Sequence, residues 1–176
     1  MKETEVINAL NGRLVTVEEI KEKEAKAIGI AEEYLGKEKN TLMIIAYEEI
    51  AELQQALTKH IRGKTNRINI IEECADVMLG IAYISRLHKL GIDIHREYEA
   101  EKIQTLTICH RLSVLQEEIY KALNNEKHHL HIVCIKTLRT LATVKKEFNI
   151  TNDEINKVIN CKIYRLLNRI ENQTKI

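Results

Sequence analysis

The chain contains the stretch Glu48-Glu49-Ile50-Ala51-Glu52 and, further on, the stretch Glu73-Cys74-Ala75-Asp76. Each stretch places carboxylates three residues apart. Residues three apart are neighbours on one face of a helix. If both stretches are helical, each offers a pair of carboxylates that can bind one cation together.

An acidic helix face in solvent is the first alternative, because Glu and Asp are usually exposed. The phase of the apolar residues tests it, with about 100° of rotation per residue. On the first helix, Glu49 falls in the middle of the apolar stripe and Glu52 at its edge; on the second, Glu73 falls in the middle and Asp76 at the edge. The stripes consist of Leu42, Ile45, Ala46, Leu53 and Ala56, and of Val77, Gly80, Ile81, Ile84 and Leu87.

Burying an unpaired carboxylate costs on the order of several kcal/mol, which is comparable to the net stability of a whole domain. Four converging carboxylates therefore ionise only if a cation lies among them. Neither Lys nor Arg occurs on the two apolar stripes. A hard divalent cation such as Mg2+, bound through oxygen, is the expected partner. Glu48 and Glu72 point further round their helices, and we expect them to be solvated.

The double motif resembles that of the MazG-like, all-α nucleotide pyrophosphohydrolases, which include the dimeric-type dUTPases. Their pattern is E-E-x-x-E, a spacer, and E-x-x-D on the next helix. Here it reads E-E-I-A-E at 48–52 and E-C-A-D at 73–76, with 53–72 as the spacer. The resemblance covers residues 16–106 well and the rest weakly. It implies Mg2+-dependent hydrolysis of a nucleoside triphosphate to a nucleoside monophosphate and pyrophosphate.

Glu49, Glu52, Glu73 and Asp76 are the expected metal ligands. Because all four are carboxylates, we expect Mn2+ to substitute for Mg2+. A bound ion would neutralise charge on the leaving pyrophosphate and lower the pKa of a water molecule that attacks. Glu48 either orients or deprotonates that water or simply faces solvent, and the sequence leaves both readings open.

Candidate substrate contacts lie outside the double motif. Arg62, Lys64, Lys102 and Lys136 are candidate phosphate contacts, and a solvated loop is the alternative for the first two. Candidate stacking partners for the base are Tyr34, Tyr47, Tyr83 and Tyr120, for which ordinary packing is the alternative.

Two other function classes stay open. The first is a metal-dependent hydrolase of another substrate, such as an alarmone, a signalling nucleotide or a phosphoribosyl compound. The second is a non-catalytic MazG-like protein that binds a nucleotide or a partner. Intact carboxylates at all four ligand positions argue against the second class.

The composition favours one all-α domain over residues 1–176. The 176 residues include no proline, no tryptophan, one phenylalanine and six glycines, so little interrupts helix formation. The net charge of +1 gives no argument for binding nucleic acid or a membrane. The four cysteines are far apart, without a C-x-x-C motif, which favours free thiols in a reducing cytoplasm. No stretch resembles a signal peptide or a membrane span.

The apolar periodicity predicts most helix boundaries. Thr16-Val17-Glu18-Glu19 has the pattern of a capping box, after a lead-in at 1–15. The first predicted helices are 16–34, 40–60 and one from about 66 that ends at Gly91 as its C′ residue. The pattern of 94–123, capped by Asp93, predicts two helices that meet near 105–107, and helices at 130–148 and 153–172 follow.

The second half, residues 107–176, reads as a degenerate copy of the acidic, metal-binding half, residues 1–106. Glu52 to Leu57 can be aligned with Glu118 to Leu123, and Cys74 with Cys134. In this alignment Glu49, Glu72, Glu73 and Asp76 correspond to Leu115, Ile132, Val133 and Lys136. We therefore expect a MazG-like bundle of two tandem repeats with one site per chain. A homodimer or higher homo-oligomer is also expected, to cover the first long helix.

Overall fold

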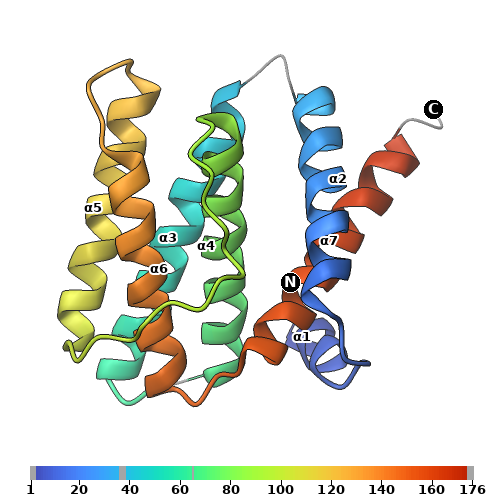
Figure 1. Ribbon diagram of the computed structural model, residues 1–176. Coiled ribbons are helices and arrows are strands. Elements are labelled where there is room, and N and C mark those ends of the chain that lie inside the picture. The colour runs from blue at the N-terminus through green and yellow to red at the C-terminus, as the bar shows by residue number, and fades with distance from the viewer. Residues whose placement is uncertain (1–2, 36–38, 65, 174–176) are drawn as a thin grey trace.

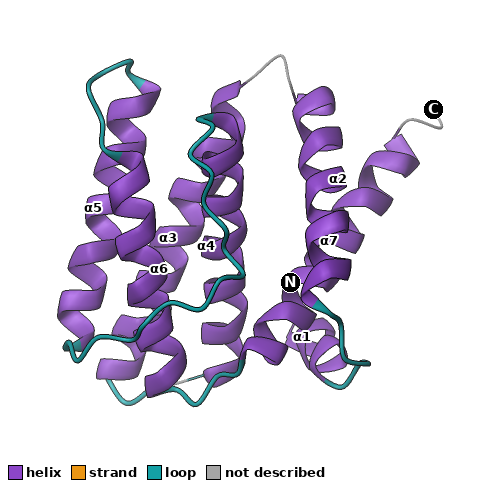
Figure 2. Ribbon diagram, in the orientation of Figure 1, coloured by secondary structure: helices purple, strands orange, loops and turns teal. Residues whose placement is uncertain are grey.

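The computed structural model describes residues 3–35, 39–64 and 66–173, and the regular secondary structure of this part of the chain is all α-helix, without strands (Figures 1 and 2). The helices are α1 (Glu3–Leu10), α2 (Val17–Leu35), α3 (Lys39–Ile61), α4 (Arg67–Leu87), α5 (Thr105–Leu123), α6 (Leu130–Glu147) and α7 (Asn152–Gln173). The prediction of an all-α fold is confirmed.

The helices form two neighbouring groups (Figure 1). In one group α3 packs against α4 and α5, and α5 packs against α6. In the other group α7 packs against α1 and α2, and it also contacts α4. A short connection joins α3 to α4, so the two acidic helices run antiparallel, as the length of the spacer predicted (Figure 1).

Side-chain caps fix the starts of α2 and α4. The predicted capping box is present: Thr16 Oγ1 accepts from the Glu19 amide at 3.2 Å, and the Thr16 amide donates to Glu19 Oε2 at 3.1 Å. Asn66 Oδ1 accepts from the amides of Ile68 and Asn69, which lie in the first turn of α4.

The helices α3 to α6 share one mode of termination. Each is followed by a residue with positive φ: Gly63, Lys89, Asn125 and Asn149. After α4, the Leu90 amide donates to the Ser85 carbonyl at 2.8 Å and the Lys89 amide to the Arg86 carbonyl at 3.1 Å. This is a Schellman motif. The predicted end of this helix at Gly91 is therefore wrong by about one turn: the left-handed residue that closes the helix is Lys89, and Gly91, which also has positive φ, lies beyond the helix end.

The helix predicted to begin at Ile94 is absent, and residues 88–104 form an irregular segment that passes over α4 and α6 (Figure 1). Asp93 Oδ1 accepts from the His95 amide at 3.0 Å, which turns the chain rather than starting a helix. Further on, the Glu101 amide donates to Thr143 Oγ1 on α6 at 2.9 Å. Backbone groups that a helix would have paired internally are thus satisfied by side chains.

Two smaller expectations also need correction. Residues 3–10 of the predicted lead-in form α1, whose Val6 is fully buried. In the second half, Leu115 and Val133 are buried, as core positions should be, but Ile132 is 54% exposed whereas its counterpart Glu72 is 7% exposed. The phase of α6 turns Ile132 toward solvent. The internal duplication itself stays a prediction.

The antiparallel contact between α3 and α4 is unusually close at Gly80. A Cβ atom added to Gly80 would lie 2.9 Å from Cβ of Ala46 and 3.3 Å from its Cα. Both residues lie about one turn from the acidic positions, Ala46 from Glu49 and Gly80 from Asp76. The absence of a side chain at Gly80 therefore sets the helix spacing next to the acidic residues.

We expect Gly80→Ala to lower the free energy of unfolding by about 1 kcal/mol. Overpacking costs about 1–3 kcal/mol, and the better helix propensity of Ala returns only about 1 kcal/mol. The matched control is Gly29→Ala in α2, where the new Cβ would meet only Nη2 of Arg86, at 3.4 Å. Urea unfolding should show Gly29→Ala to be neutral or stabilising. Equal stability of the two variants would contradict the close contact.

Candidate metal centre

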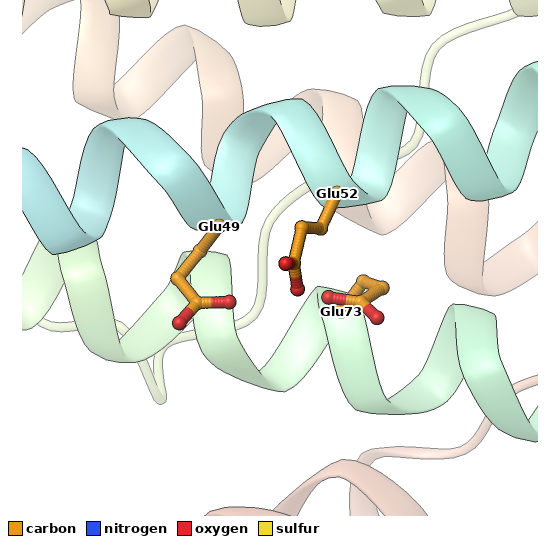
Figure 3. A group of neighbouring side chains, drawn as sticks. All are labelled: Glu49, Glu52 and Glu73. Carbon is orange, nitrogen blue, oxygen red and sulfur yellow. The ribbon is translucent and has the colours of Figure 1, made fainter. Parts of the chain in front are cut away.

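Three carboxylates meet where α3 packs against α4 (Figure 3). Glu49 and Glu52 lie one turn apart on α3 and point toward α4, from which Glu73 points back at them. One oxygen from each lies within 4.8 Å of the others. Oxygen ligands lie about 2.0–2.6 Å from Mg2+ or Ca2+, so ligands on opposite sides of an ion are about 4–5 Å apart. These three residues, the carboxylate cluster, have the spacing of a cation site.

The carboxylate cluster extends from the interior to the surface. Glu73 is buried, with 7% of its surface exposed, Glu49 is half-buried and Glu52 is exposed. The phase argument anticipated this gradient, since Glu49 and Glu73 fall within the apolar stripes and Glu52 at an edge. An ion can therefore reach the cluster from the side of Glu52.

The two more buried carboxylates are electrostatically strained. Burial raises the pKa of Glu73 from 4.5 to about 8, and the charges of Asp76 and Glu52 add to this effect. Burial likewise raises the pKa of Glu49 to about 7, again with Asp76 and Glu52 contributing. Among the described residues, Oε2 of Glu73 is buried and has no hydrogen-bond partner. An orphaned buried oxygen is uncommon, and a hard cation would supply the partner that it lacks, so these residues fit a divalent ion.

The fourth expected ligand, Asp76, has a different partner. Lys162 Nζ on α7 lies 2.5 Å from Asp76 Oδ2 and 3.3 Å from Glu72 Oε1. Burial raises the pKa of Asp76, and the charge of Lys162 opposes this shift. Burial disfavours the charge of Lys162, but Asp76 and Glu72 outweigh it and raise the pKa of the ammonium group. We call these three residues the Lys162 triad.

The Lys162 triad corrects two expectations. Glu72 was expected to be solvated, but it is only 7% exposed. No Lys or Arg lies on the apolar stripes of α3 and α4, but a cation comes from α7, since Lys162 lies 86 residues beyond Asp76 in the chain. The phase argument, applied to α7, gives the missing signal, because Lys162 lies in the apolar stripe formed by Ile155, Ile159 and Leu166.

A cleft of about 370 Å³ lies beside the carboxylate cluster, between the two helix groups. Its lining consists of Glu24, Ala27 and Ile28 from α2, Leu42, Ile45, Ala46 and Glu49 from α3, Asp76, Leu79, Gly80 and Tyr83 from α4, and Lys162, Ile163, Arg165 and Leu166 from α7. This central cleft is mostly apolar, and Glu49, Asp76 and Lys162 bring charge into it. It therefore connects apolar surface directly to the candidate metal centre.

A buried histidine supports one wall of the central cleft. His95 Nε2 lies 2.8 Å from Glu24 Oε2, and the His95 side chain is only 2% exposed. On the same segment Asp93 forms an ion pair with Lys21 of α2 at 2.7 Å. The irregular segment after α4 thus attaches α2 to the rest of the fold. Neither His95 nor Glu24 was identified from the sequence, because the segment was predicted to be helical.

The other candidate residues lie in various places. Tyr83 is half-buried and lines the central cleft, whereas Tyr47 and Tyr120 are exposed and the Tyr34 side chain is outside the described residues. Glu48 is exposed on α3, beside the carboxylate cluster. The basic candidates Arg62, Lys64, Lys102 and Lys136 are exposed and do not line the cleft.

Two further findings concern the cysteines and the apolarity of the helices. Cys74 and Cys134 are buried and Cys109 and Cys161 are half-buried, all four as free thiols. Within residues 3–35, 39–64 and 66–173, no helix combines the length and apolarity that a bilayer crossing requires.

Comparison with known proteins adds no family assignment. No protein-family model matches the chain, and no curated protein or solved structure is significantly similar to it.

The strained carboxylates predict how the stability of the metal-free protein depends on pH. Below about pH 4.5 these groups are protonated in both states. Above it they ionise in the unfolded chain, whereas in the fold Glu49 stays protonated up to about pH 7 and Glu73 up to about pH 8. The free energy of unfolding should therefore fall as the pH rises through this window. Glu73→Gln should reduce the fall and be more stable than the parent protein at pH 8.

Urea unfolding in EDTA at pH 5, 6, 7 and 8 measures this dependence. The matched control is Glu22→Gln, which removes an exposed carboxylate from α2 and should keep the slope of the parent protein. Equal slopes for Glu73→Gln and the parent protein would mean that Glu73 is not strained in the metal-free fold.

Proposed function

We propose that the protein is a Mg2+-dependent, MazG-like nucleotide pyrophosphohydrolase, which converts a nucleoside triphosphate and water into a nucleoside monophosphate and pyrophosphate. One observation carries the proposal: Glu73, whose carboxylate lies within 4.8 Å of those of Glu49 and Glu52, has a buried oxygen without a hydrogen-bond partner. The E-E-x-x-E and E-x-x-D motifs, on antiparallel neighbouring helices, add support.

The proposed ligands of the ion are Glu49, Glu52 and Glu73. When bound, the ion would neutralise phosphate charge and lower the pKa of a bound water molecule. Glu48 is the candidate general base, because it is exposed and is an i, i+4 neighbour of Glu52 on α3. A base at Glu48 would accept a proton from the water as its oxygen attacks the α-phosphorus and the bond to the leaving pyrophosphate breaks.

The central cleft suits the nucleoside part of such a substrate. Its volume of about 370 Å³ is within the usual range for small-molecule sites, about 300–1,000 Å³. The apolar walls offer a surface for a base, with Tyr83 as the aromatic candidate, and Glu49 joins the cleft to the carboxylate cluster. A ligand in the cleft can therefore extend its phosphates toward the proposed ion.

Nucleotides incubated with Mg2+ and assayed for pyrophosphate test the proposal. We expect hydrolysis of at least one canonical (d)NTP. EDTA should abolish this activity, and Mn2+ added after chelation should restore it. Glu49→Gln, Glu52→Gln and Glu73→Gln should each reduce kcat/KM at least about 100-fold, because each removes a charged ligand. Glu22→Gln is the control, with an exposed carboxylate outside the cleft.

Product analysis separates the proposed reaction from its alternatives. Release of orthophosphate would mean that a different phosphoanhydride bond is cleaved. Turnover only of an alarmone, signalling nucleotide or phosphoribosyl compound would mean that the substrate class is different. Both results are compatible with an ion on the carboxylate cluster. Turnover that survives EDTA would contradict the role of the carboxylate cluster. The expectations of a homo-oligomer and a cytoplasmic location stay predictions, and the free thiols support the second.

A further inference from the structure

Asp76 and the carboxylate cluster belong to one acidic region, but the Asp76 carboxylate is paired with Lys162 of α7. The Lys162 triad is compact, with distances of 2.5 and 3.3 Å, and its side chains are only 9–15% exposed. Attraction between opposite charges is strong when little water screens them. An ion that used Asp76 as a ligand would have to displace the Lys162 ammonium group or lie next to it.

Both consequences are unfavourable. Displacement would leave a buried ammonium group without its partners, and breaking such a pair is costly. Coexistence would set a divalent cation against a positive charge at short range. The ion pairs of Lys162 are with Glu72 and Asp76, and on the carboxylate cluster its charge acts at longer range, lowering the pKa of Glu49. In the described part of the chain, an oxygen of Glu73 also remains without a hydrogen-bond partner.

We propose that Lys162 is a built-in cation that takes the place of a second divalent ion, so that each chain binds one ion on Glu49, Glu52 and Glu73 and Asp76 is not a ligand. The inference rests on the proposed function in one respect, namely that the carboxylate cluster binds a divalent ion. It departs from the four-carboxylate site expected from the sequence.

Lys162 also has a position suited to substrate. An ammonium group has three donor hydrogens, of which Asp76 and Glu72 use two. Lys162 lines the central cleft together with Glu49. Its third hydrogen can therefore donate to a phosphate oxygen while the ion on the carboxylate cluster binds another. Asp76 and Glu72 act as positioning residues for this ammonium group.

Isothermal titration of the full chain with Mn2+, checked by the electron paramagnetic resonance signal of free Mn2+, tests the inference. The parent protein should bind one ion per chain. Lys162→Met should bind two, because it frees Asp76 and Glu72 for a second ion. The matched control is Lys157→Met on the same helix, whose side chain is also 13% exposed and pairs with Asp153 at 3.1 Å. It should keep a single ion.

Asp76→Asn provides a second test if Lys162→Met does not fold. Asp76→Asn removes only a neighbouring charge and should weaken the affinity for the single ion much less than Glu73→Gln, which removes a ligand and should weaken it at least about tenfold. Two ions in the parent protein, one ion in folded Lys162→Met, or equal losses in Asp76→Asn and Glu73→Gln would overturn the inference and leave the proposed function standing. A parent protein that binds no Mn2+ would overturn the proposed function itself.

Discussion

Repulsion among carboxylates that reach from the surface into the interior is the constraint on which the centre of this fold depends. Glu49, Glu52 and Glu73 converge because α3 and α4 pack closely, and Gly80 against Ala46 permits that approach. Hydrophobic burial along the two helices brings the acids together, and their charges oppose it. Burial therefore favours the protonated forms of Glu49 and Glu73, whereas a bound cation would favour their ionised forms, and this opposition would link stability, pH and ion binding in one site.

The second helix group completes the acidic region. The helix α7 contributes Lys162, which neutralises part of the charge on Asp76 and Glu72 and lines the central cleft. The helix α2 contributes the opposite wall and is attached through the His95–Glu24 and Asp93–Lys21 contacts. Residues from both ends of the chain thus surround one cleft. A nucleotide bound there would contact both helix groups at once.

The sequence predicted the parts of the structure that depend on local patterns. Apolar periodicity identified α2, α3, α6 and α7 nearly to their ends, and the capping box at Thr16 formed as expected. The same method was wrong for 94–104, where Ile94, Tyr98 and Ile103 pack against the core from an irregular segment; the four-residue spacing of Ile94 and Tyr98 matches that of a helix. It also misjudged the end of α4, because Lys89 is not a residue type that marks a left-handed turn.

The candidate site likewise has features that follow from the local sequence and features that depend on tertiary packing. The positions of Glu49 and Glu73 inside the apolar stripes were readable, because helix phase is a local property. The pairing of Lys162 with Asp76 and Glu72 was not readable from α3 and α4, because it depends on how α7 docks. Lys102 and Lys136 are exposed and outside the central cleft, which depends on tertiary packing and not on their charge or sequence alignment.

The position of a bound ion is the most direct measure of the central claim. Crystals of the protein grown with Mn2+ allow the ion to be located by its anomalous scattering. The account predicts one strong peak between α3 and α4, coordinated by carboxylate oxygens of Glu49, Glu52 and Glu73, with Asp76 still bound to Lys162. No peak at this position, or a peak only at surface carboxylates elsewhere, would contradict it.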